Sequence, residues 1–118
     1  VVAFAKREAR RGARYEGVIL DPPAFGRGAK GEVWKIEENL PSLLQTLGAL
    51  LSDAPGSFFL VNGYAAGYAS RSFAQAVESA FPSIALGTSG HGEYGELHIK
   101  ETASERVVPS GMYVRFTR

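Results

Sequence analysis

Apolar residues along the chain follow two spacings, which predict an alternation of helices and strands. Between residues 36 and 51, Ile36 and six leucines recur every one, three or four positions, as on the wide apolar face of a helix. Apolar and helix-favouring residues predict two further helices, over 1–11 and about 70–81. The segments Tyr15 to Leu20 and Ser57 to Val61 are short and mostly apolar, and Val18-Ile19-Leu20 lacks polar alternation, as in parallel strands covered on both faces.

The pattern changes after Pro82, which ends the third predicted helix. A short apolar strand is expected at 84–86, followed by a glycine-rich segment over 87–95. Alternating residues at 96–100 and 112–117 predict an antiparallel pair joined by a turn around Pro109-Ser110-Gly111, and the glycine-rich stretch 24–33 is expected to be a loop. Strands that alternate with helices predict an α/β fold, with a parallel sheet, crossover helices and a terminal antiparallel strand.

Composition narrows the classes of protein. The 118 residues suffice for a single domain, without a linker, and the absence of cysteine excludes disulfides, thiolate metal sites and thiol nucleophiles. No apolar run approaches the roughly 18 residues of a spanning helix and no signal peptide opens the chain, so we expect a cytoplasmic protein without a membrane partner. His91 has no second ligand at metal-binding spacing, so no metal site is predicted.

The net charge of +1 hides an uneven distribution. The first 35 residues hold eight Lys or Arg against four Asp or Glu, and the remainder is acidic on balance. Such a basic end suits an anionic partner, although basic helices are as often merely solvated.

Candidate chemistry lies where two predicted strands end. Asp21-Pro22-Pro23 follows one strand and Asn62-Gly63-Tyr64 the other, so Asp21 and Asn62 should meet at the rim where α/β sheets bind ligands. The two prolines hold Asp21 rigidly. The carboxylate and a proline carbonyl could then accept N–H groups while Phe25 stacks on a ring, an arrangement suited to a flipped nucleobase.

The loop after this rim admits a competing interpretation. Gly26-Arg27-Gly28-Ala29-Lys30-Gly31 fits G-x-G-x-x-G, but four residues separate it from the strand, and the acidic residue at the expected distance, Asp53, follows a helix. A phosphate-binding Walker A loop would need Lys-Ser where Glu32-Val33 stands. A basic loop that contacts substrate is the better interpretation.

The run Tyr15-Glu16-Gly17-Val18-Ile19-Leu20-Asp21-Pro22-Pro23-Ala24-Phe25-Gly26, with Gly31-Glu32-Val33-Trp34-Lys35, resembles motif IV of class I S-adenosylmethionine-dependent methyltransferases. The similarity is greatest to the bacterial ribosomal-RNA methyltransferase-like branch with an Asp-Pro-Pro-x-Phe signature. The closing run from Pro109 to Phe116 and the arginine-rich first helix resemble that branch too. The resemblance covers residues 1–118 as the C-terminal half of a Rossmann-like methyltransferase domain, without its cofactor-binding N-terminal half.

The resemblance implies roles for individual residues. Asp21 and Pro22 would be catalytic, Asp21 and Pro23 would contact the cofactor S-adenosyl-L-methionine, and substrate would be bound by Phe25, Arg27, Lys30, Asn62 and Tyr64. Because cytosine C5 methylation normally needs a cysteine, we expect transfer to a nucleobase nitrogen, in ribosomal RNA. The alternative is a non-catalytic α/β module that binds RNA or a protein through its basic N-terminal face.

The missing half has a consequence for the chain alone. The strand from Tyr15 to Leu20 would become a sheet edge without protecting residues, so we expect self-association or pairing with the missing N-terminal half along this strand. The isolated fragment should be inactive and bind the cofactor poorly.

Overall fold

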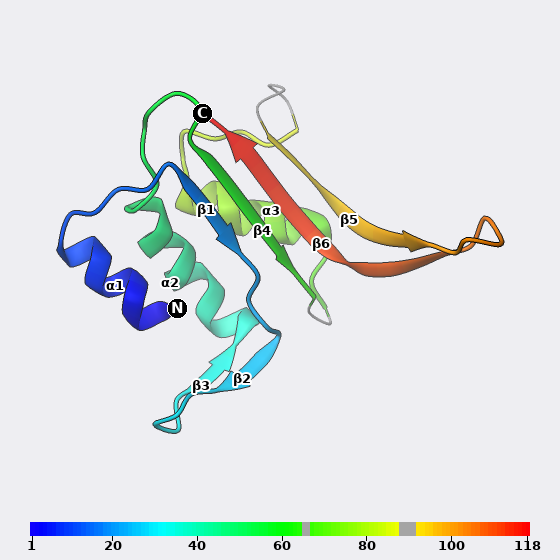
Figure 1. Cartoon of the computed structure of the whole chain (residues 1–118), viewed down its shortest axis with the longest axis horizontal. Coiled ribbons are helices and arrows are strands. Elements are labelled where there is room, and N and C mark those ends of the chain that lie inside the picture. Colours follow the sequence, from blue (N-terminus) through cyan, green and yellow to red (C-terminus); the bar gives the residue numbers. More distant parts are fainter. Residues whose placement is uncertain (65–66, 88–91) are drawn as a thin grey trace.

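A computed structural model describes residues 1–64, 67–87 and 92–118, which form a mixed sheet, a small hairpin and three helices (Figure 1). The elements in chain order are α1 (Val2–Arg10), β1 (Gly17–Leu20), β2 (Phe25–Arg27), β3 (Val33–Lys35), α2 (Ile36–Gly48), β4 (Phe58–Gly63), α3 (Ser70–Ala80), β5 (Gly92–Lys100) and β6 (Val107–Thr117).

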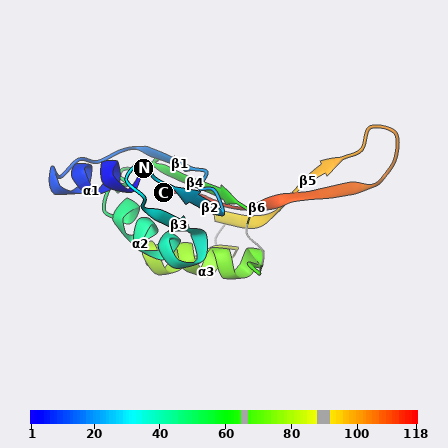
Figure 2. The same cartoon turned by 90° about the horizontal axis from the view of Figure 1, so that it is seen from below.

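The main sheet has the strand order β1-β4-β6-β5. β1 runs parallel to β4, whereas β6 is antiparallel to both of its neighbours. The helices all lie on the same side of this sheet, with α1 beside α2 (Figure 2). The α/β fold with crossover helices and a terminal antiparallel strand is therefore confirmed, with β1 at one edge and β5 at the other.

The core lies between the sheet and helices α2 and α3. On β4, Phe59 and Val61 are buried whereas Phe58 is exposed, so one face of the strand packs and the other is open. Phe59, Phe81 and Phe116 form a cluster of rings with centroids 4.8 to 5.5 Å apart. The expectation that these strands are covered on both faces is wrong for the described residues.

Several predicted boundaries differ from those in the structure. The expected loop 24–33 contains β2, which pairs with β3 as an antiparallel hairpin. Residues 84–86 form no strand, and Ile84 instead continues a turn by donating its N–H to the Phe81 carbonyl at 2.9 Å. β5 already begins at Gly92, within the segment expected to be a glycine-rich connection.

The C-terminal hairpin also differs from the expectation. Pro109, Ser110 and Gly111 lie inside β6, and the turn is formed by residues 101–106. Between the pairs Glu96↔Met112 and His98↔Pro109, Ser110 and Gly111 stand opposite the single residue Leu97, so β6 carries a bulge. Gly111 has φ +115°, and a Cβ there would lie 2.8 Å from the Gly63 carbonyl oxygen.

Candidate active site

The ends of β1 and β4 bring two polar side chains together. Leu20 of β1 is in register with Val61 of β4, so the residues that follow, Asp21 and Asn62, are neighbours. The Asn62 Nδ2 donates a hydrogen bond of 2.8 Å to the Asp21 Oδ1. The predicted meeting of Asp21 and Asn62 at one rim is confirmed, and Asp21 stays exposed with its Oδ2 unbonded within the described part of the chain.

The two prolines behave differently. Pro22 is buried and turns the chain away from the sheet, whereas Pro23 is exposed and its carbonyl accepts a 2.7 Å hydrogen bond from the Trp34 indole Nε1. The Ala24 carbonyl accepts the backbone N–H of Ile36 at 3.0 Å. These bonds tie the segment after Asp21 to β3 and the start of α2. The Pro23 carbonyl, which the sequence offered as an acceptor for a substrate N–H, therefore bonds within the fold instead.

Asn39, two residues before Pro41, is of a residue type that predicts a helix N-cap, but helix α2 already begins at Ile36. Its N-cap is Lys35, in an extended conformation, and the Asn39 Oδ1 accepts the Lys35 backbone N–H at 2.8 Å. Pro41 lies within the first turns of the helix. The early start shortens the link from β3 to α2 and holds the β2–β3 hairpin close to the rim.

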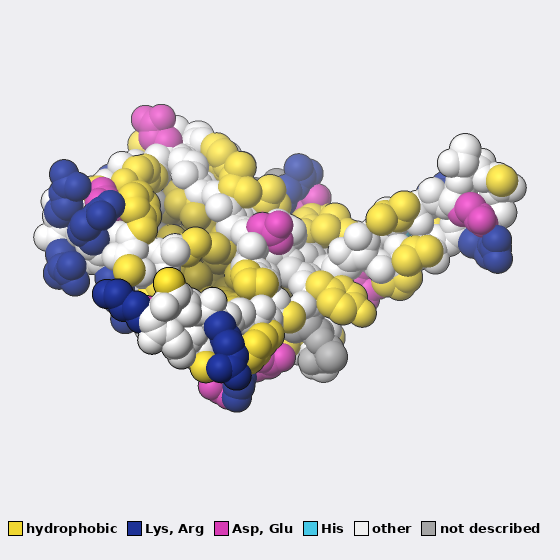
Figure 3. Space-filling model, turned by 60° about the horizontal axis from the view of Figure 1, so that its bottom comes forward, with side chains coloured by type: hydrophobic (Ala, Val, Ile, Leu, Met, Phe, Trp, Pro, Cys, Tyr) yellow, Lys and Arg dark blue, Asp and Glu magenta, His cyan; other side chains and the backbone are white. Residues whose placement is uncertain are grey.

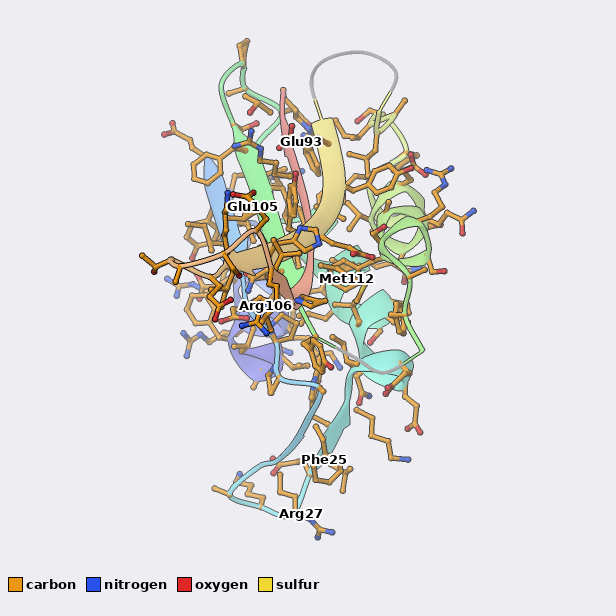
Figure 4. The ribbon with its side chains drawn as sticks, turned by 90° about the vertical axis from the view of Figure 1, so that its right-hand side faces the viewer. Phe25, Arg27, Glu93, Glu105, Arg106 and Met112 are labelled. Atoms are coloured by element: carbon orange, nitrogen blue, oxygen red, sulfur yellow. The ribbon has the colours of Figure 1, made fainter. Side chains whose placement is uncertain are left out.

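The β2–β3 hairpin carries three of the predicted substrate residues. Phe25 is 54% exposed on β2, and Figure 4 shows it on the hairpin with Arg27 near the tip. The side chains of Arg27 and Lys30 are exposed and form no ion pair among the described residues, while the Lys30 backbone N–H donates to the Glu32 Oε2 at 3.0 Å. Tyr64, exposed directly after β4, lies at the Asn62 end of that strand. The structure therefore brings Asp21 and Asn62 together at the rim, with Tyr64 directly after the same strand, whereas Phe25, Arg27 and Lys30 lie on the hairpin that projects from this rim (Figure 1).

Tyr113 is a polar residue of this region that the sequence did not single out. It stands opposite Asn62 on β6, and its hydroxyl donates to the Glu93 Oε1 at 3.2 Å, which also accepts the Arg115 Nε at 2.8 Å. Partial burial and the Glu93 carboxylate raise the pKa of the Tyr113 hydroxyl. The alternation at 112–117 predicts that Tyr113 and Met112 lie on opposite faces of the strand, but the pairing of Tyr113 with Asn62 follows only from the folded sheet.

Some of the basic side chains at the N-terminal end already form hydrogen bonds to a carboxylate within the chain. Glu8 is a buried residue of α1, and its carboxylate accepts hydrogen bonds from the Tyr15 hydroxyl at 3.0 Å, Arg7 Nε at 3.1 Å and Arg11 Nη1 at 3.3 Å. These donors lower the pKa of the Glu8 carboxyl. Lys6 and Arg10 have no acidic partner in the described chain, and Figure 3 shows the basic side chains gathered at the α1 end.

No group of three or more His, Asp or Glu side chains among the described residues could hold a metal ion, and His91 falls outside these residues. None of the described helices is long and apolar enough to cross a membrane.

Comparison with solved structures identifies the fold. The S-adenosylmethionine-dependent methyltransferase from Agrobacterium tumefaciens superimposes with a TM-score of 0.81 at 27% identity, covering 98% of this chain and 37% of that protein. SMU.776, a putative methyltransferase complexed with SAH, gives 0.65 at 18% identity, with 99% and 30% covered. A putative S-adenosylmethionine-dependent methyltransferase from Streptococcus mutans gives 0.59 at 16% identity, with 98% and 28% covered.

The chain has the Rossmann-like fold of these methyltransferases and spans at most 37% of their length. No family model matches the sequence, and no curated protein matches it.

Proposed function

We propose that this chain is part of an S-adenosylmethionine-dependent methyltransferase that modifies a nucleobase nitrogen in RNA. The fold shared with methyltransferases supports the reaction class. The observation that carries the proposed site is the hydrogen bond from Asn62 to Asp21 at the carboxyl ends of two parallel strands, where α/β folds bind their ligands.

The Asp21 carboxylate suits an amino or ring N–H group as acceptor. Asn62 occupies Oδ1 and fixes the plane of the carboxylate, so Oδ2 is free to accept a hydrogen bond from substrate. That bond would orient the nitrogen lone pair and stabilise the positive charge that develops on nitrogen, and the carboxylate could accept the proton that the nitrogen loses on methylation. When bound, S-adenosylmethionine supplies an activated methyl group, so no nucleophilic side chain is needed, in accord with a chain that lacks cysteine.

The residues present fit only part of a cofactor site. Asp21, Pro22 and Pro23 could line the side of the cofactor that faces the acceptor. β1 has no partner on its outer edge within the described ranges, so a ligand held against Asp21 would have protein on one side. We propose that the rest of a longer polypeptide pairs along β1 and provides the contacts to the methionine and ribose groups.

The substrate class rests on the surface beside the rim. Phe25 and Tyr64 offer exposed rings for base stacking, and Arg27 and Lys30 offer cations for phosphate. Single-stranded RNA with an extruded base satisfies both features. We propose ribosomal RNA as the substrate because the motif resemblance is greatest to the ribosomal-RNA methyltransferase-like branch.

The experiment is a methyl-transfer assay on the longer polypeptide that contains this chain, with labelled S-adenosylmethionine and either RNA or protein extracts as acceptor. We expect label in RNA, and a fall on the order of a hundredfold for Asp21→Ala with cofactor affinity little changed. Glu37→Ala, which removes an exposed carboxylate on α2, is the matched control. Transfer to protein alone, or full activity of Asp21→Ala, contradicts the proposal.

The second candidate is a non-catalytic module that binds RNA through α1. The unpaired Lys6 and Arg10 favour it. In that case Lys6→Glu with Arg10→Glu abolishes RNA binding while Asp21→Ala has no effect on any readout.

A further inference from the structure

The β5–β6 hairpin extends past the rest of the sheet as an arm formed by residues 96–110 (Figures 1 and 2). β4 ends at Gly63, opposite Met112, so beyond this pair β6 has no partner on its β4 side. Both strands of the arm therefore present an open edge to solvent within the described structure. Open edges carry unpaired backbone groups that can add another strand.

The two edges of the arm are not equivalent. On the β6 side, Pro109 removes a backbone N–H, and the Ser110-Gly111 bulge interrupts regular pairing. Proline and bulges are devices that blunt an edge. β5 has neither, because the extra residue of the bulge lies on β6 and residues 92–100 contain no proline. The β5 edge is the one left open to strand addition.

The arm also exposes apolar side chains that its own domain does not cover. Ile99 and Val108, which are paired across the hairpin, are 62% and 61% exposed, and Leu97 and Val107 are exposed as well. Figure 3 shows hydrophobic side chains along the narrow arm, with charged groups at its end. Exposed apolar side chains on a sheet edge that has no proline or bulge indicate an interaction surface.

We propose that the β5 edge binds the β5 edge of a second copy of this chain, antiparallel and centred on His98. When two copies of the segment Glu96-Leu97-His98-Ile99-Lys100 run antiparallel, each charged residue faces one of opposite charge and each apolar residue faces an apolar one. In this register Glu96 faces Lys100 of the other copy, and Leu97 faces Ile99. Each pair occurs twice because the contact is two-fold symmetric, and opposite charges and apolar pairs both stabilise antiparallel strands.

The charges of the arm argue against a nucleic-acid occupant. Residues 96–110 hold three glutamates against Lys100 and Arg106, and Arg106 pairs with Glu101 at 2.9 Å, so the arm has no excess of positive charge. Lys100 pairs with Glu105 at 2.8 Å in a single copy, and because both side chains are exposed, Lys100 can exchange this partner for Glu96 of the second copy. Phosphate binding would require unpaired cations. The contact would also be smaller than a standard interface of about 1,200–2,000 Å², so we expect association that depends on concentration.

The test is sedimentation velocity of the chain over a range of concentrations, for wild type and charge variants. Glu96→Lys or Lys100→Glu alone places like charges opposite each other twice per dimer and should weaken association about tenfold. The double variant Glu96→Lys/Lys100→Glu restores the pairing and should restore association. Glu37→Lys makes the same charge change on α2 and should leave association unchanged.

Mixing the two single variants gives a sharper readout. The Glu96→Lys chain and the Lys100→Glu chain are complementary to each other, so an equimolar mixture should associate more tightly than either variant alone. A monomeric wild type, insensitivity to Glu96→Lys, or a double variant as weak as the single ones would overturn the proposal.

Cross-linking tests the register independently. Because the chain lacks cysteine, His98→Cys introduces a single thiol at the centre of the proposed contact, and mild oxidation should link two copies. Thr102→Cys, in the turn of the arm, would lie far from its own copy and should not cross-link. Equal cross-linking of both variants contradicts pairing centred on His98.

Discussion

Asp21 and Asn62, 41 residues apart in the chain, are joined by a 2.8 Å hydrogen bond at the ends of two adjacent parallel strands. The amide fixes which carboxylate oxygen is free and where its lone pairs point. We therefore expect Asn62→Ala, in the longer methyltransferase proposed above, to lower turnover by about tenfold to a hundredfold while cofactor affinity changes little. Steady-state kinetics with cofactor calorimetry would check this, and a loss confined to cofactor affinity would contradict it.

Phe25 should contribute to substrate binding rather than to stability. Its ring is 54% exposed, so Phe25→Ala should leave the melting temperature nearly unchanged and weaken RNA binding by about 1–3 kcal/mol, the range for loss of one stacked base. Val33→Ala is the matched control, since Val33 is 48% exposed on the facing strand and is not expected to stack. Equal effects of the two substitutions on RNA affinity would refute a stacking role for Phe25.

Trp34 should hold the segment that follows Asp21. Trp34→Phe keeps most of the apolar surface but removes the hydrogen bond from Nε1 to the Pro23 carbonyl, so we expect a loss of about 1 kcal/mol in the free energy of unfolding. Hydrogen exchange should rise at the amide of Ile36, which bonds to the Ala24 carbonyl in the same segment. Unchanged exchange at Ile36 would show that the indole does not tether this segment.

The Glu8 cluster predicts a specific dependence of stability on pH. The pKa of Glu8 lies below its ordinary value of 4.5 in the folded chain because Tyr15 and Arg7 donate hydrogen bonds to the carboxylate, with further help from Arg11. A lowered folded pKa contributes stability that is present above the unfolded pKa and is lost as pH falls through the folded pKa. The advantage of wild type over Glu8→Gln in thermal melts should thus hold at neutral pH and shrink in acid.

The Tyr15 hydroxyl predicts how stability depends on pH on the alkaline side. Its hydrogen bond to the Glu8 carboxylate raises the pKa of the Tyr15 hydroxyl above 10.0. The stability gained from this bond is present below the unfolded pKa and is lost as pH rises through the folded one. Above neutral pH, the difference in stability between wild type and Tyr15→Phe should therefore shrink only in strong alkali. In acid it should shrink together with the Glu8 contribution, because protonation of Glu8 weakens the same bond. A difference that already shrinks at neutral pH would contradict the role of this bond.

The β1 edge predicts how the isolated 118-residue chain behaves. Ile19 is 68% exposed on β1, next to an open edge without lysine or proline, so the chain should aggregate along it. Ile19→Lys should reduce that aggregation in light-scattering measurements and leave the β5-dependent association intact. Calorimetry should find little binding of S-adenosylmethionine to the isolated chain, whereas micromolar affinity would overturn the proposal that contacts from a longer polypeptide are needed.

The sequence by itself determined those elements of the fold whose residue pattern lies entirely within the element. Helix α3 was predicted over about 70–81 and runs over Ser70–Ala80, because its apolar periodicity is uninterrupted. Gly12 follows α1 with φ +67°, as its position after a helical stretch indicates. The meeting of Asp21 and Asn62 was also predictable, since parallel strands place their carboxyl ends at one rim.

Tertiary contacts decided the rest, because they supply partners that no local pattern specifies. Glycine and charge made 24–33 look like a loop, but pairing of β2 with β3 orders it. Pro109-Ser110-Gly111 has the composition of a turn, yet it lies within β6 because pairing with β5 continues past the bulge and the close approach of Gly111 to Gly63 requires a residue without a side chain. The position of Tyr113 beside Asn62 and the exposed β5 edge exist only through strand register, which is a property of the assembled sheet.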